Sequence, residues 1–165
     1  MGQAAATICV NRFLEMLRSE SGLIGALRLL SPGTGLEISE LTDRQILGSN
    51  VSFELLEKTV GAKYPSVHIY CDKVSNTMRE KFRSFSGTVQ LTAEVRVSQD
   101  RLDGIEETLK QYTDALTLVL DQNRGDWAPG VQFTGGYEIS YQPVKHGGKN
   151  FLQTAKVSLA VNVSM

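Results

Sequence analysis

The sequence has little of what most enzymes and metal sites are built from. It contains two histidines and two cysteines in 165 residues. Cys9 and Cys71 lack a paired spacing, which argues against a disulfide framework and against a thiolate metal site. His68 and His146 belong to no short-spaced metal motif. We therefore expect no metal and no cofactor, and we interpret both cysteines as small buried apolar groups.

Catalytic arrangements are scarce as well. Cys71 follows His68 by three positions on a predicted strand, which points the two side chains to opposite faces and disfavours a thiolate and imidazole pair. One dense run of carboxylates falls where a helix is predicted to begin, and the helix dipole explains it: Asp100, Asp103, Glu106 and Glu107. We therefore expect no catalytic residues and no enzymatic activity.

Charge and hydropathy argue against two further classes. A net charge of -1 with 21% charged residues disfavours a protein that binds nucleic acid by bulk electrostatics, although a local basic patch remains compatible. The first long apolar run is interrupted by Asn11, Arg12, Glu15 and Arg18, so we expect neither a signal peptide nor a membrane span. We expect residues 1–165 to fold as a single domain in a reducing cytoplasm.

The clearest pattern covers residues 87–122. Polar and apolar residues alternate from Thr88 to Ser98, which is the period of a strand with one buried face. After a two-residue corner, the apolar period changes to three and four residues from Leu102 to Leu120, which predicts a helix folded back over the apolar face of the sheet. Asp100 is the expected N-cap of this helix.

The first 30 residues predict a helical amino-terminal part. Apolar stripes indicate two helices within residues 3–30, with a break at Ser21 and Gly22. Packing on the sheet is the main interpretation of these stripes, and an oligomer interface is the alternative. Residues 36–61 give a weaker pattern, with a short extended piece at 36–38 and a helical turn or two at 51–58.

Residues 64–165 predict an α+β core. Strands are predicted at 66–74, after Tyr64 and Pro65, and at 131–142 and 152–163, with a bulge at Gly135 and Gly136. Trp127 is interpreted as a packed plug more than as a binding anchor. The predicted fold class is α+β, with about four mostly antiparallel strands, a long helix packed on one face and the N-terminal helices.

Two basic loops are the candidate binding features. The first, residues 75–86, is too long for a tight hairpin turn and interleaves aromatic with basic residues, which suits a nucleic-acid backbone or an acidic partner. The second is a glycine-containing hairpin tip at 143–150. The candidate residues are Arg79, Lys81, Phe82, Arg83, Lys145, His146 and Lys149. A solvated first loop with its phenylalanines tucked into the core is the alternative.

The order of elements resembles the tail terminator (tail completion) proteins of long-tailed bacteriophages. The resemblance covers residues 64–163 and consists of the strand after Tyr64 and Pro65, the phenylalanine-containing loop, the alternating strand, the helix with Tyr112, Asp114, Ala115 and Leu120, and the closing long hairpin. It lies in the pattern and layout, because no invariant motif carries it.

This resemblance implies a structural role in a virion. Such proteins form a homo-oligomeric ring, usually of six subunits, that caps the tail tube, stops its polymerisation and joins the tail to the head connector. A ring needs heterologous contacts that close, and open sheet edges supply backbone groups for them. One basic loop is then expected to face the tube or the connector, and DNA is expected only as it passes through the lumen. The implied location is the tail-neck junction of a virion assembled in the host cytoplasm.

Three alternatives remain open. A neck or head-completion protein of the same particle shares this layout with a terminator. A tail tube subunit is also possible, but it should polymerise alone. From another class, the fold suits a small nucleic-acid-binding or ligand-binding module, for which Tyr70 and the basic loop speak. The missing basic surplus and the missing RNA-binding strand signature speak against that module.

Overall fold

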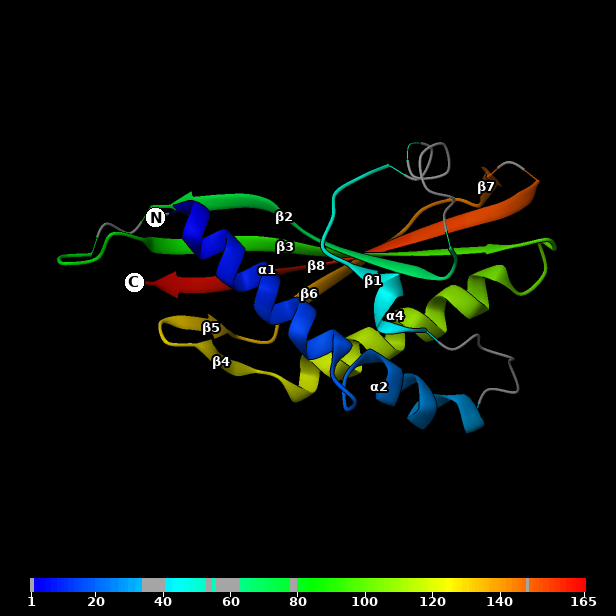
Figure 1. Ribbon diagram of the computed structural model, residues 1–165, viewed down its shortest axis with the longest axis horizontal. Coiled ribbons are helices and arrows are strands. Elements are labelled where there is room, and N and C mark those ends of the chain that lie inside the picture. The colour runs from blue at the N-terminus through cyan, green and yellow to red at the C-terminus, as the bar shows by residue number, and fades with distance from the viewer. Residues whose placement is uncertain (1, 34–40, 53–54, 56–62, 78–79, 148) are drawn as a thin grey trace.

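The computed structural model describes residues 2–33, 41–52, 55, 63–77, 80–147 and 149–165 (Figure 1). The helices are α1 (Gly2–Arg18), α2 (Leu23–Leu30), α4 (Ile105–Gln122) and the short 3₁₀ turns η1 (Ser31–Gly33) and η2 (Asp43–Gln45). The strands are β1 (Ile46–Leu47), β2 (Ser66–Asn76), β3 (Ser86–Gln99), β4 (Gly125–Ala128), β5 (Val131–Phe133), β6 (Tyr137–Tyr141), β7 (Lys145–Gly147) and β8 (Asn150–Ser164).

The sheet corrects the predicted fold. The described residues form one eight-stranded mixed sheet in place of the predicted four strands. Its order is β1-β2-β3-β8-β5-β4, and β6 and β7 also pair with β8. The β1 strand is parallel to β2, whereas every other pair is antiparallel. The fold class stays α+β, but the strand count and the single-long-helix description were wrong.

Short strands account for the difference. The strand predicted at 131–142 is divided into β5 and β6, because Gly135 adopts a φ of 108° that ends the extended conformation between them. The predicted bulge is therefore a break. The β1, β4 and β7 strands span two to four residues each, which is too short for a period of two to show in the sequence.

The two N-terminal helices are confirmed. The break between the end of α1 and the start of α2 lies at Ser21 and Gly22, as predicted. A Cβ at Gly22 would lie 2.2 Å from the carbonyl oxygen of Met16, so a larger residue does not fit there. The α1 helix packs on β2 and β3, and α2 packs along α4. The extended piece predicted at 36–38 and most of the helical turn predicted at 51–58 lie outside the described residues.

The β3 strand and α4 form the centre of the core. Five odd-numbered residues of β3 share one apolar cluster with the inner faces of α1 and α4: Val89, Leu91, Ala93, Val95 and Val97. The predicted start of α4 was wrong, because the helix begins at Ile105, after Gly104 with a φ of 82°. Leu102 lies outside the helix and is 56% exposed, and Asp100 is not its N-cap. The corner between β3 and α4 is therefore longer than predicted. The side-chain amide of Gln99 stabilises it by donating to the carbonyls of Arg101 and Asp103 at 2.7 and 2.8 Å.

Trp127 is confirmed as a packed plug. It is buried, and its ring lies 5.6 Å from that of Phe13 and 5.4 Å from that of Phe133. Its indole Nε1 donates to the carbonyl oxygen of Asn123 at 2.8 Å, so its polar atom is satisfied. Trp127 thereby ties α1 to the β4 and β5 hairpin.

In the part of the chain that the structure describes, we find no helix of sufficient length and apolar character to cross a membrane.

Candidate assembly surfaces

The loop between β2 and β3 projects from one end of the molecule on an anchored stem (Figure 1). Asn76 bridges the two strands, since its amide nitrogen donates to the carbonyl of Ser84 at 3.4 Å and its oxygen accepts from the backbone of Ser86 at 2.9 Å. Phe85 is buried, and its backbone exchanges two hydrogen bonds of 2.9 Å with Met165. The base of the loop is therefore held by the sheet and by the end of β8.

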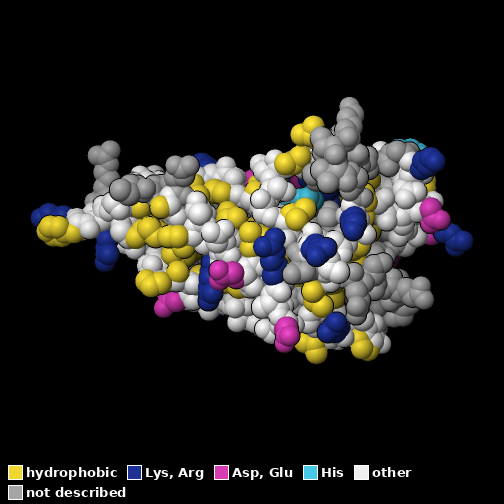
Figure 2. Space-filling model, viewed as in Figure 1, with side chains coloured by type: hydrophobic (Ala, Val, Ile, Leu, Met, Phe, Trp, Pro, Cys, Tyr) yellow, Lys and Arg dark blue, Asp and Glu magenta, His cyan; other side chains and the backbone are white. Residues whose placement is uncertain are grey.

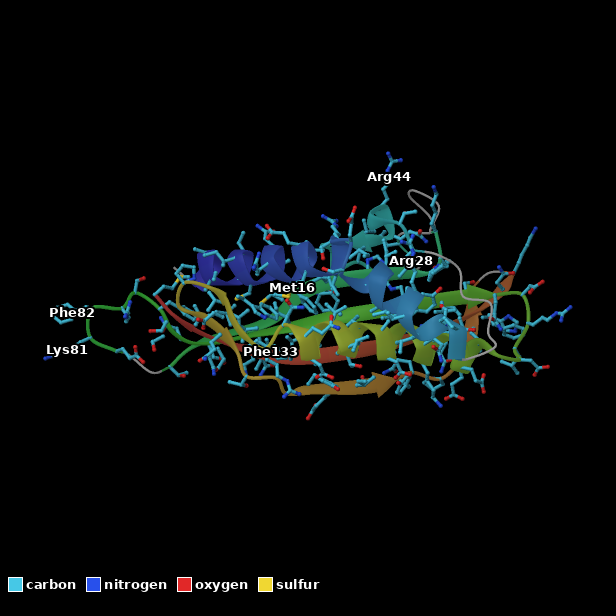
Figure 3. All side chains as sticks on the ribbon, turned by 90° about the horizontal axis from the view of Figure 1, so that it is seen from below. Met16, Arg28, Arg44, Lys81, Phe82 and Phe133 are labelled. Atoms are coloured by element: carbon cyan, nitrogen blue, oxygen red, sulfur yellow. The ribbon has the colours of Figure 1, made fainter. Side chains whose placement is uncertain are left out.

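The tip of this loop presents an aromatic ring to solvent. Phe82 is fully exposed, at 101%, and adopts a positive φ of 64°. Lys81 and Arg83 on either side of it are exposed as well. Figure 3 shows Lys81 and Phe82 at the far end of the long axis, and Figure 2 shows a hydrophobic and a basic group together there. The alternative in which both phenylalanines enter the core is thus true of Phe85 and wrong for Phe82.

The second basic loop lies at the opposite end. Lys145 and His146 belong to β7, which pairs with the start of β8, and Lys149 is in the tip of that hairpin. The three side chains are exposed, and the ring of His146 lies 5.0 Å from that of Phe151. The two groups of predicted residues are therefore not brought together (Figure 1). Arg79 lies outside the described residues.

The outer edges of β2 and β6 are among the open edges of the sheet in the described residues. Beyond the two residues that pair with β1, the outer edge of β2 has no strand beside it from Ile69 to Asn76. The outer edge of β6 is also unpaired, and it carries Tyr137 and Tyr141 at 37% and 38% exposure. Such edges present free backbone donors and acceptors.

A buried polar cluster was missed by the sequence analysis. It lies on the second face of the sheet, where β3 was expected to be solvated. It comprises the buried residues His68, Tyr70, Glu94 and Arg96, with the half-exposed Lys156 at its edge. The Arg96 Nε donates to Glu94 Oε2 at 2.6 Å, and Lys156 Nζ lies 3.7 Å from Glu94 Oε1. Glu94 and Arg96 are only 9% and 4% exposed, so β3 is buried on both faces there.

The connection before β2 covers this cluster. Arg96 Nη2 donates to the carbonyl of Val51 at 2.6 Å, and Ser49 Oγ lies 3.1 Å from Nδ1 of His68. A signal was available in the sequence, because a connection of some thirty residues between a helix and a strand has to lie on a surface of the domain. The polar side chains of the cluster are natural hydrogen-bond partners for the irregular part of this connection.

Burial sets the protonation states of the cluster. It lowers the pKa of His68 to about 4, with a further lowering by the Arg96 guanidinium that Glu94 partly opposes. Burial, followed by the charge of Glu94, raises the pKa of Tyr70 to about 12. His68 is therefore neutral and Tyr70 protonated at neutral pH. Neither of these two groups is an acid or base poised near pH 7.

Burial makes the two cysteine thiols less reactive, because it raises the pKa of each. Burial, and then the neighbouring Cys71, raises the pKa of the Cys9 thiol to about 11. Cys9 is fully buried, as expected, whereas Cys71 is half-buried. The described residues hold no group of three or more histidine, cysteine or acidic side chains that could bind a metal ion.

No protein-family model matches the sequence, and no curated protein matches it either.

Proposed function

We propose that this chain is a structural protein of a bacteriophage virion, a tail terminator. Copies of it form a ring that caps the tail tube, stops further polymerisation and joins the tail to the head connector. The resemblance in the order of elements over residues 64–163 motivates the proposal. The structural observation that supports it best is the pair of open sheet edges, because they run in opposite directions.

The direction of the edges follows from the number of strands between them. The β2, β3, β8 and β6 strands are consecutive neighbours, and each pair is antiparallel. With four alternating strands, β2 and β6 point in opposite directions. When identical copies stand side by side in the same orientation, β6 of one meets β2 of the next as an antiparallel pair, the more stable arrangement. A heterologous contact of this kind repeats around a ring until it closes.

The two basic loops supply surfaces for two different neighbours. They lie at opposite ends of the long axis, which is close to parallel to the strands (Figure 1). In a ring whose copies stand side by side, one loop reaches each rim. A protein that joins a tube to a connector needs two such separated surfaces. We therefore assign one loop to the tail tube and the other to the head connector.

The experiment is electron microscopy of particles from cells in which a stop codon interrupts this gene. Overlong or irregular tubes beside unjoined heads are the expected result. Tails of normal length beside unjoined heads would move the protein to the neck. Intact virions would refute a role in assembly.

A loop variant tests the assignment at residue level. Exchanging Arg79, Lys81 and Arg83 for glutamate should block joining while leaving the circular dichroism spectrum and melting temperature unchanged. The exchange of Lys110, an exposed cation on α4 outside both loops, for glutamate is the matched control and should assemble normally. Normal particles from the triple variant would remove this loop from the joining surface.

A further inference from the structure

The exposed apolar side chains of the sheet lie at its open edges. Among the described residues of the strands, three large hydrophobic side chains are exposed: Val74 of β2 at 37%, and Tyr137 and Tyr141 of β6 at 37% and 38%. Sheet edges are usually protected by charged residues, because an apolar edge invites pairing with another strand. Both edges therefore present apolar surface that a neighbouring strand would cover.

These three side chains share the face of the sheet that the helices cover. Val74 is aligned with Val89 of β3, and residues opposite each other across a strand pair point to the same face. Tyr137 is aligned in the same way with Leu159 of β8. Val89 and Leu159 both belong to the hydrophobic core. Tyr141 follows Tyr137 by four positions on β6, so it points to that face as well.

The other face of the same two edges carries a pair of opposite charges. Lys73 precedes Val74 on β2 and is aligned with Gln90, an exposed residue of the second face of β3. Glu138 follows Tyr137 on β6, so the alternation of the strand points it to the second face too. Both charged side chains are exposed. Each edge therefore offers one apolar and one charged side chain in succession, and the two charges differ in sign.

A single register satisfies both faces when β6 of one copy pairs antiparallel with β2 of the next. With Tyr137 opposite Val74, Glu138 lies opposite Lys73. A slip of one residue would turn the apolar side chains of one strand to the face that carries the charges of the other. A slip of two residues would keep the faces matched but would move Glu138 away from Lys73. The charges therefore exclude the slips that the apolar residues alone would allow.

A bulge in β2 makes this edge selective. The register between β2 and β3 shifts between Cys71 and Lys73, so Asp72 is the extra residue. With Asp72 passed over, Ile139 of β6 falls opposite Cys71, and both are half-buried residues. A bulge and a lysine are two means by which an edge strand avoids indiscriminate pairing. A strand that offers a glutamate opposite Lys73 is favoured over other strands for the same reason.

We propose that Lys73 and Val74 of each copy dock against Glu138 and Tyr137 of the next copy, and that these two cross-strand pairs set the register of the subunit contact. The inference rests on the proposed ring, and its partner is a second copy of this chain. It deepens that proposal by naming the residues that fix the contact, and it requires neither basic loop.

Cysteine cross-linking of the full-length protein tests the register. Val74→Cys combined with Tyr137→Cys should give a ladder of disulfide-linked oligomers on mild oxidation, because the Cβ atoms of directly opposite residues lie about 4.5–5.5 Å apart. Val74→Cys combined with Tyr141→Cys is the matched control. Tyr141 is equally exposed on the same edge but lies about 13 Å further along the strand, so this variant should not exceed the wild type. A ladder from the control variant instead of the test variant overturns the register.

Sedimentation velocity over a range of concentrations tests the charge pair. Lys73→Glu and Glu138→Lys should each weaken the association of the wild type by about 2- to 30-fold per contact, because an attraction is replaced by a repulsion. The variant with both exchanges should associate like the wild type. Lys110→Glu, which reverses an exposed cation on α4, is the control and should leave association unchanged. A wild type that stays monomeric, or a double variant no tighter than the single variants, overturns the contact.

The outcomes separate this inference from the proposed function. Rings that form in the wild type and persist unchanged in Lys73→Glu leave the terminator proposal standing and remove this contact. A contact confirmed by cross-linking, in a protein whose stop codon leaves virions intact, keeps the contact and removes the terminator role.

Discussion

Acid should destabilise this protein through His68, and the effect can be calculated. His68 is 1% exposed, and burial, with help from Arg96, lowers its pKa from 6.5 to about 4. Between these two values the unfolded chain binds a proton that the folded chain does not. Stability is therefore constant above pH 6.5 and falls as the pH drops towards 4. The cost is about 1.4 kcal/mol between pH 7.5 and 5.5 and approaches about 3 kcal/mol at pH 4.

Burial is the largest cause of the lowered pKa of His68, and the charged groups around the ring modify it. Arg96 is fixed beside it on β3 and disfavours a second positive charge, while Glu94 opposes this effect in part. Lys156 also approaches Glu94, at 3.7 Å, and shares the negative charge that would otherwise support a protonated imidazole. Protonation of the His68 ring would also change its contact with Ser49, which helps to hold the connection before β2 against the sheet.

Urea unfolding at pH 7.5, 6.5 and 5.5 measures the effect. The comparison is between the wild type and His68→Gln, whose difference in unfolding free energy should change by about 1.4 kcal/mol over this range. His146→Gln is the control, because His146 is exposed and its replacement should leave the pH dependence unchanged. Equal slopes for the wild type and His68→Gln would refute the reasoning and would place the source of any acid sensitivity elsewhere.

Three further predictions concern packing, charge and pairing. Trp127→Ala should lower the free energy of unfolding by roughly 3–5 kcal/mol, measured by urea titration, because it empties the space between α1 and the β4 and β5 hairpin. Arg96→Met should cost roughly 3–5 kcal/mol in the same assay, and adding Glu94→Gln should recover most of the loss, since a buried carboxylate then no longer depends on the half-exposed Lys156 as its one remaining ionic partner. Lys73→Cys combined with Glu138→Cys should form disulfide-linked oligomers on mild oxidation if β2 and β6 of neighbouring copies pair. On a non-reducing gel, either single exchange should give no more disulfide-linked oligomer than the wild type.

The elements that the sequence predicts well are those with long uniform periods. The α1, α2 and β8 elements, the central strand β3 and the inner stripe of α4 were found because each repeats its pattern over eight residues or more. The start of α4 was missed because Leu102 fits the helical period although Gly104 redirects the chain. Local backbone geometry there outweighed the hydrophobic pattern.

The candidate site divides in the same way. Exposed, charged loops between strands could be predicted as projections, because turn chemistry and the absence of an apolar period mark them. The burial of Arg96 could not be predicted, since its guanidinium is covered by Val51, which lies 45 positions away in the sequence. A hollow lined by Glu80, Asp126 and Asn162, among others, also brings together residues from distant parts of the chain, which no local pattern reports.

The proposed ring has a consequence for its lumen. Helices α1 and α4 pack against one face of the sheet, and the connection before β2 contacts the other face at His68 and Arg96. On that second face, Gln90, Ala160 and Asn162 are exposed and uncharged. A ring closed through β2 and β6 with its helices outward places this surface along the lumen, and the basic loops at its rims. Because DNA binding depends on cations that neutralise phosphates, such a wall lets DNA slide past, and any retention of DNA falls to the rims. Exchanging Gln90 and Asn162 for lysine in the intact ring should therefore slow or block DNA passage without preventing ring assembly, measured as infectivity against the yield of joined particles.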